Sequence, residues 1–258
     1  MKKILLLVIL SSSLTSQAED WPQWFGPQRD GVWRESGILE KFPEGGPRVL
    51  WRTPIQRGYA GPAVAGKRVY RMDREVDRSA KAKRESARTG SQPGKERLLC
   101  LDASDGTVIW EKSYPCAYTM SYPAGPRVTP LVNGERVYSS GAEGLLVCRS
   151  TTDGRELWQH DFKERFQART QTWGFAASPL IHGDLLICLA AGKGSIAVAF
   201  HKETGKEVWR ALNAGQPGYC PPRIVKHAGR DLLIIWHPES VNALDPATGR
   251  LFWTIPWK

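Results

Sequence analysis

The hydrophobic positions of this chain fall in short runs, and a glycine-containing turn follows each run. Residues 178–212, SPLIHGDLLICLAAGKGSIAVAFHKETGKEVWRAL, show the pattern most clearly. Apolar stretches rich in β-branched and aromatic residues occupy 178–181, 185–190, 195–200 and 206–212. Runs of this length, separated by turns that contain glycine, predict four short β-strands rather than helices.

The end of this unit recurs along the chain. FHKETGKEVW has counterparts in LDASDGTVIW, RSTTDGRELW and LDPATGRLFW, and in each of them Gly stands four places before Trp. The glycine predicts a hairpin turn with a positive φ angle. The Trp then falls on the last strand of its unit, where a large ring can pack against the next unit. The structural repeat residues are Gly106, Trp110, Gly154, Trp158, Gly205, Trp209, Gly249 and Trp253.

These Trp residues are 48, 51 and 44 residues apart, a period typical of solenoids and propellers. A single four-stranded sheet cannot bury both of its faces, so the units must stack on one another. We therefore expect an all-β fold, namely a β-propeller with about four four-stranded blades. The expected blades span approximately 61–114, 128–162, 178–212 and 221–257.

The motifs resemble those of a known family. The LDxxTGxxxW pattern, with DWPQWFGPQRDGVW at 20–33, is similar to the pyrroloquinoline-quinone-like (PQQ-like) repeat of exported propellers, including the BamB-like family. The resemblance implies seven or eight blades and a lone outer strand, here RVLWRTPI at 48–55, that closes the ring. Three alternatives remain for the four units. They are part of a longer ring, or half-rings paired into a dimer, or a four-bladed ring closed on itself.

The N-terminal residues are typical of a secretory signal peptide. Lys2 and Lys3 precede an apolar run, and small residues lead up to Ala18, where we expect cleavage. The apolar run is too short to cross a membrane, and no later segment is typical of a transmembrane helix. We expect 1–18 to be removed, 19–47 to form an N-terminal extension, and 48–258 to form the propeller of an exported protein, periplasmic or secreted.

The formal net charge of +10 is unevenly distributed. Residues 71–97 carry nine basic and five acidic residues and few apolar ones. This composition predicts a solvated, mobile loop, and the alternative is an electrostatic landing site on an anionic surface. Because we expect export, nucleic acid is a poor candidate partner.

The five cysteines raise the question of disulfides. Cys100 and Cys148 stand six residues before the repeat glycine, where the other two units have Ala199 and Ala243. That position therefore favours a small buried side chain, and Cys188 in an apolar run is interpreted in the same way. The remaining candidates for a disulfide or for surface thiols are Cys116 and Cys220.

Strand order divides the loops between two rims. In an antiparallel four-stranded unit, the turns after the first and third strands point one way, and the second turn and the link to the next unit point the other way. The second set holds the long irregular segments, and such loops commonly carry binding sites. We call this set the loop rim; it comprises 71–97, 114–127, 163–177, 213–223 and 237–240. Its candidate binding residues are Tyr118, Tyr122, Arg127, Arg169, Trp173, Phe175, Tyr219, Arg223 and His237. The alternative is that they only pack the loops over the central channel.

Two functional hypotheses remain. PQQ-dependent dehydrogenases are similar in fold, and the resemblance implies Ca²⁺ held by several oxygens, a catalytic Asp, a Trp platform and often a disulfide between adjacent cysteines. The sequence has no adjacent cysteines, and Glu143, Glu164 and Glu239 are the main acidic residues of the loop rim outside 71–97. We assign no catalytic or metal residue and expect no cofactor, with PQQ and Ca²⁺ as the alternative.

The leading hypothesis is a non-catalytic exported scaffold that binds an envelope protein or another periplasmic partner through the loop rim. The alternative is a PQQ-dependent quinoprotein dehydrogenase that oxidises alcohols or sugars.

Overall fold

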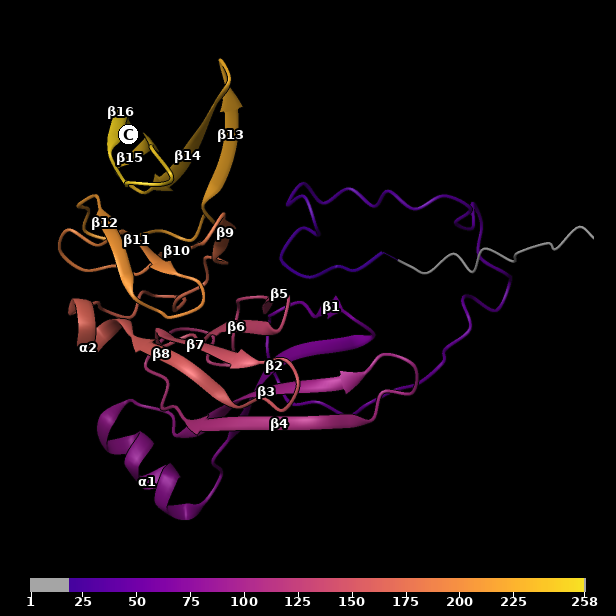
Figure 1. Ribbon diagram of the computed structural model, residues 1–258. Helices are drawn as coiled ribbons and strands as arrows, with labels where there is room; N and C mark the ends of the chain where they lie inside the picture. The colour runs from indigo at the N-terminus through magenta and orange to yellow at the C-terminus, as the bar shows by residue number, and fades with distance from the viewer. Residues whose placement is uncertain (1–18, 258) are drawn as a thin grey trace, which may run out of the picture.

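The computed structural model describes residues 19–257, so the predicted signal peptide at 1–18 lies outside the described residues. The described chain forms four four-stranded antiparallel sheets, each built from four consecutive strands, which succeed one another in chain order from the bottom to the top of Figure 1. The prediction of an all-β fold with blade-like units is confirmed. The strands are β1 Ala63–Ala65, β2 Arg68–Val76, β3 Gly94–Asp102 and β4 Val108–Pro115 in the first sheet, β5 Leu131–Asn133, β6 Arg136–Ser140, β7 Leu145–Ser150 and β8 Glu156–Asp161 in the second, β9 Leu180–His182, β10 Leu185–Leu189, β11 Ala197–His201 and β12 Glu207–Ala211 in the third, and β13 Arg223–His227, β14 Arg230–His237, β15 Ser240–Leu244 and β16 Leu251–Pro256 in the fourth.

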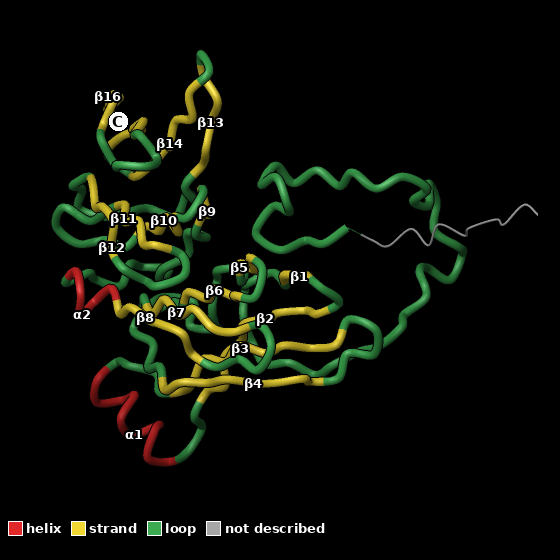
Figure 2. The backbone as a smooth tube through the Cα atoms, viewed as in Figure 1, coloured by secondary structure: helices red, strands yellow, loops and turns green. Residues whose placement is uncertain are grey.

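Helices are few and short, as Figure 2 shows. α1 (Ala80–Thr89) lies between β2 and β3, and α2 (Phe162–Phe166) comes directly after β8. Within residues 19–257, no helix is long and apolar enough to cross a membrane.

The repeat tryptophans hold consecutive sheets together. Trp110, Trp158 and Trp209 are 8%, 9% and 7% exposed. Their indole Nε1 atoms donate to the carbonyl oxygens of Thr151, Lys202 and Pro246 in the next sheet, at 3.0, 3.2 and 3.1 Å. Each ring also lies against the hairpin glycine of that sheet, namely Gly154, Gly205 and Gly249 in turn. The hydrophobic core therefore lies between the sheets, as the repeat predicted.

The register explains why small residues precede the hairpin. Cys100, Cys148, Ala199 and Ala243 lie directly opposite the repeat tryptophans on the neighbouring strand. A large indole leaves room for only a small side chain there, so the two cysteines and two alanines are equivalent. Cys116 and Cys220 are both free, so the disulfide considered for them is not formed.

Trp253 differs from the other repeat tryptophans. It is 39% exposed, and every residue of β16 is exposed. The expectation that this ring lies between two sheets is therefore wrong, because no sheet within residues 19–257 packs against β16. A four-bladed ring closed on itself would cover β16 with the first sheet, so that alternative is wrong as well.

Residues 48–55 do not form the predicted outer strand. Their tryptophan nevertheless takes the position of a repeat tryptophan. Trp51 lies against Gly106, and its Nε1 donates to the carbonyl oxygen of Ala103 at 2.9 Å. The first sheet thus receives the same indole contact that the other three receive from the preceding sheet.

The N-terminal motif touches the beginning of all four sheets. Trp21 forms a β-bridge with Val64 in β1, and the amide of Val132 in β5 donates to the carbonyl of Pro22. Arg29 donates to the carbonyl of Pro179, directly before β9, at 2.8 Å, and to that of Pro222, directly before β13, at 3.2 Å. Burial and, to a lesser extent, nearby Arg223 lower the pKa of Arg29 to about 10. This segment therefore joins the first strands of the four sheets.

The prediction of a mobile loop at 71–97 is wrong. β2 and β3 are nine residues long each and carry α1 at their end. Across the two strands Asp73 faces Arg97, Arg74 faces Glu96 and Glu75 faces Lys95. Opposite charges in register stabilise a strand pair, so this segment forms a hairpin without the usual apolar alternation.

Candidate loop-rim binding site

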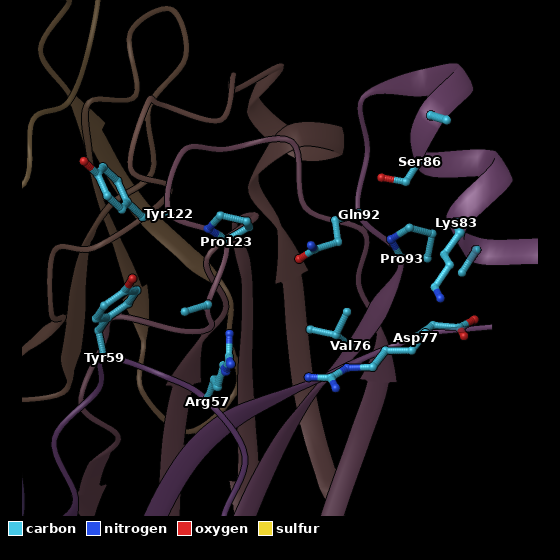
Figure 3. A pocket seen from close by; sticks show the side chains of 14 residues that line it. Arg57, Tyr59, Val76, Asp77, Lys83, Ser86, Gln92, Pro93, Tyr122 and Pro123 are labelled. Carbon is cyan, nitrogen blue, oxygen red and sulfur yellow. The ribbon is translucent and has the colours of Figure 1, made fainter. Parts of the chain in front are cut away.

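Two large hollows lie on the loop rim of the described chain. The first, which we call the hairpin pocket, has a volume of about 700 Å³ and lies between α1 and residues 122–124. Figure 3 shows Tyr122 and Pro123 on one side and Ser86 and Lys83 of α1 on the other, with Val76 and Gln92 between them. The second, of about 740 Å³, is lined by 167, 169–172, 191–193, 213–217 and Glu239.

A buried carboxylate organises the loops beneath the hairpin pocket. Glu96 is fully buried and accepts hydrogen bonds from the hydroxyls of Tyr114 and Tyr118 and, at 2.9 Å, from the amide of Ala142 in the second sheet. Burial raises the pKa of Glu96 above its ordinary value, against the opposing effect of these donors. The carboxylate therefore ties two neighbouring sheets together at the loop rim.

Arg74 continues this network to the pocket. Its guanidinium lies 3.9 Å from the centre of the Tyr118 ring, and the side chain is 1% exposed. It donates to the side-chain oxygen of Gln92 at 2.6 Å and to the carbonyl oxygen of Pro123 at 3.0 Å. Burial lowers the pKa of Arg74 below its ordinary value. Since Gln92 and Pro123 both line the pocket, Arg74 holds its walls together from beneath.

Glu143, a second rim carboxylate, also forms its bonds within the protein. It is 8% exposed and pairs with the ammonium group of Lys163. It also accepts from the amide of Thr119 at 2.9 Å and from the hydroxyl of Thr170 at 2.5 Å. The network of Glu143 fixes the links that lie after the first and second sheets.

The structure separates the sequence-predicted rim residues into exposed and buried sets. Tyr122 and Trp173 are 69% and 52% exposed, and Trp173 packs on Tyr219 with ring centres 5.3 Å apart. Arg169 lines the second hollow, and Arg223 is exposed. Arg127 stacks on Tyr59 and donates to the carbonyl of Tyr122 at 2.7 Å.

Three predicted rim residues point into the protein. Tyr118, Phe175 and His237 are 1%, 4% and 3% exposed. Phe175 packs on Phe162, and Ser240 Oγ lies 3.1 Å from His237 Nε2. In the structure these three side chains pack beneath the loops.

Sequence reasoning missed Arg74 and Glu96, the centre of the buried network. Both belong to the charged segment whose composition predicts a loop, and they pair across β2 and β3. The alternation of opposite charges at 73–75 and 95–97 was the signal that could have found them.

The carboxylates of the rim do not fit a Ca²⁺–quinone site. A hard cation needs several converging oxygens, whereas Glu96 and Glu143 are occupied by hydroxyl, amide and ammonium donors. Glu239 accepts from the amide of Gly215 at 2.6 Å, and Glu164 is exposed on α2. Across residues 19–257, no group of three or more His, Cys, Asp or Glu side chains is arranged to hold a metal ion.

The chain resembles solved propeller structures at low sequence identity. BamB from Moraxella catarrhalis has a TM-score of 0.52 and 16% identity, with 80% of this chain and 54% of that chain covered. Quinohemoprotein alcohol dehydrogenase from Comamonas testosteroni has a TM-score of 0.58 and 14% identity, with 92% and 41% covered. The chain thus spans about half the length of that BamB structure, and these likenesses show the fold alone.

Among curated protein sequences, no significant match to the chain was found. A sequence profile of the family described as outer membrane protein assembly factor BamB matches residues 94–258. Because this match covers more than half of the sequence, the chain belongs to that family.

Proposed function

We propose that this protein is an exported, non-catalytic propeller scaffold that binds an envelope protein or another periplasmic partner through its loop rim. The observation that carries the proposal is that two aromatic residues of the rim are exposed while two of its carboxylates are buried. Tyr122 and Trp173 are exposed near basic residues and the two large hollows. Glu96 and Glu143 are buried, and their carboxylates are bound by partners within the protein. Exposed aromatic and Arg residues are the usual anchors of protein interfaces.

Export and the envelope setting are supported by the signal-like sequence at 1–18 and by the family, whose description names an outer membrane assembly factor. The rigid sheets support the proposal as well. Irregular loops on a fixed scaffold can present a binding surface without a large ordering cost on association.

Affinity capture from envelope extract tests the proposal. We expect the mature protein to retain a discrete partner, and Tyr122→Ala and Trp173→Ala to reduce its recovery. Val208→Ala, which removes a side chain that is 50% exposed on β12, is the matched control and retains the partner. Equal recovery with all three variants would contradict the loop-rim assignment.

A titration with PQQ and Ca²⁺, monitored by tryptophan fluorescence, tests the enzymatic alternative. We expect no saturable binding, because Glu96, Glu143 and Glu239 already accept hydrogen bonds from the protein and a hard cation needs several converging oxygens. Micromolar binding together with dye reduction by an alcohol or a sugar would overturn the scaffold proposal.

A further inference from the structure

We propose that the hairpin pocket binds an acidic peptide segment of a partner protein, with an aromatic or apolar side chain between its carboxylates. The inference rests on the proposed function, because it names the chemistry of the partner at one place on the loop rim.

Unpaired cations line the hairpin pocket. Arg57, Arg78 and Lys83 line it, and Asp77 is its acidic residue. The Asp77 carboxylate is already engaged by the amide of Ser79 at 2.8 Å. Within the described chain, none of the three cations forms an ion pair. The pocket therefore attracts carboxylates.

The acidic residues at the base of the hairpin do not offset this positive charge. Asp73 pairs with Arg97 at 2.7 Å, and Glu75 pairs with Lys95 at 3.1 Å. Glu96 is buried and bonded to two tyrosine hydroxyls, so none of the three carboxylates is available to the cations at the tip of the hairpin. The +10 charge of the chain is thus displayed in part on α1 and around the pocket.

The walls of the pocket suit an aromatic or apolar side chain. Tyr59 and Tyr122 are 56% and 69% exposed, and Ala87, Pro93 and Pro123 are among the other lining residues. The volume of about 700 Å³ is in the range of pockets that bind small molecules, so it can hold the side chain of a peptide. Because the buried Arg74 fixes two of the walls, the pocket is largely formed before a ligand arrives.

The observations favour a peptide over a membrane surface. α1 has the sequence AKAKRESART, without a single large apolar residue. A helix that lies in a lipid interface needs a broad apolar face to bury. The apolar surface at this site instead lines a concave pocket, where one side chain of a peptide fits and a bilayer does not.

Fluorescence anisotropy with the mature protein tests the inference. The probe is a labelled peptide of alternating glutamate and tyrosine, and a lysine–tyrosine peptide is the charge control. We expect saturable binding of the acidic probe alone. The double variant Arg78→Glu/Lys83→Glu weakens that binding about tenfold or more, because two ion pairs become repulsive contacts.

The matched control is Lys81→Glu/Arg84→Glu. It makes the same change in net charge on α1 at residues that do not line the pocket, so we expect less than about threefold weakening at physiological salt. Equal weakening by both double variants would show that the overall positive charge of α1, and not the pocket, attracts the peptide. That result would overturn the inference. Absence of peptide binding would also overturn it, as would binding to phosphatidylglycerol vesicles in place of the peptide, or charge-dependent self-association.

The inference and the proposed function can fail separately. If Arg78→Glu/Lys83→Glu captures the envelope partner as well as the wild type does while Tyr122→Ala does not, the acidic-peptide inference is wrong and the loop-rim proposal stands.

Discussion

At the residue scale, the hairpin glycines serve two physical needs at once. Gly205 has a φ of +69°, and a Cβ atom built on it would lie 2.7 Å from the Trp158 ring. An L-residue at this position is therefore strained by its backbone, and it also meets the indole of the preceding sheet. The glycine of each repeat is thus needed both for the hairpin turn and for the contact with the tryptophan of the preceding sheet.

Gly205→Ala and Gly183→Ala separate these two needs. Gly183 has a φ of +57°, and a Cβ atom there meets nothing within 4 Å. We expect Gly183→Ala to cost about 1 kcal/mol through backbone strain, and Gly205→Ala about 1–3 kcal/mol more through overpacking. Urea unfolding of both variants checks this difference, and equal costs would show that the indole contact is unimportant.

The raised pKa of Glu96 predicts that the free energy of unfolding depends on pH. Burial raises its pKa in the folded protein above the ordinary value of 4.5. Between these two pKa values the folded protein retains a proton that the unfolded chain has released, so the free energy of unfolding falls as pH rises through this window. Glu96→Gln removes this contribution, so its stability relative to the wild type should increase as pH rises from 4.5 towards neutral.

Denaturation of both proteins across this pH range measures the effect, and the exposed Glu164→Gln is the control. A stability difference between Glu96→Gln and the wild type that does not change with pH would contradict the raised pKa.

At the element scale, the repeat tryptophans differ according to whether another sheet packs against them. Trp158 is 9% exposed and donates to the third sheet, whereas Trp253 is 39% exposed. We expect Trp158→Ala to lower the free energy of unfolding by about 3–5 kcal/mol. Trp253→Ala in this chain should cost less than about 1 kcal/mol. Comparable costs for the two changes would show that contact with the next sheet is not what stabilises the repeat.

The same scale shows what the sequence could and could not predict. Hairpin glycines and last-strand tryptophans have a fixed spacing, because each sheet must contact its neighbour in the same way. They therefore predicted the sheets. Within 71–97, the charged parts of β2 and β3 were taken for a loop, because cross-strand ion pairs stabilise them and the hydrophobic pattern does not reveal such pairs. At 48–55 the resemblance implied an outer strand, whereas Trp51 makes the indole contact without belonging to a strand.

The candidate site was only partly predictable. Strand order identified the loop rim, and exposure supports Tyr122 and Trp173 as surface residues. The burial of Tyr118, Phe175 and His237 depends on long-range packing that no local pattern encodes. The hairpin pocket likewise depends on contacts between residues far apart in the sequence. Arg74 reaches the carbonyl of Pro123 after β4, and Glu96 bonds Ala142 only once the first two sheets have packed together.

At the scale of the whole molecule, the two rims of the fold differ in the length of their loops. One rim consists of short turns, such as the turn at Gly134 and Glu135, and the other carries α1, the long links and both large hollows. The N-terminal segment contacts the beginning of all four sheets. This arrangement is what places the exposed aromatic and basic residues on a common rim.

Site-specific photo-crosslinking in cells tests the central claim most directly. A photoreactive residue at position 122 reports on the loop rim, and one at position 135 reports on the opposite rim, where Glu135 is exposed in the turn after β5. We predict adducts of discrete mass from position 122 and none from position 135. The same adducts from both positions, or none from either, would contradict the claim that this propeller acts by binding a partner through its loop rim.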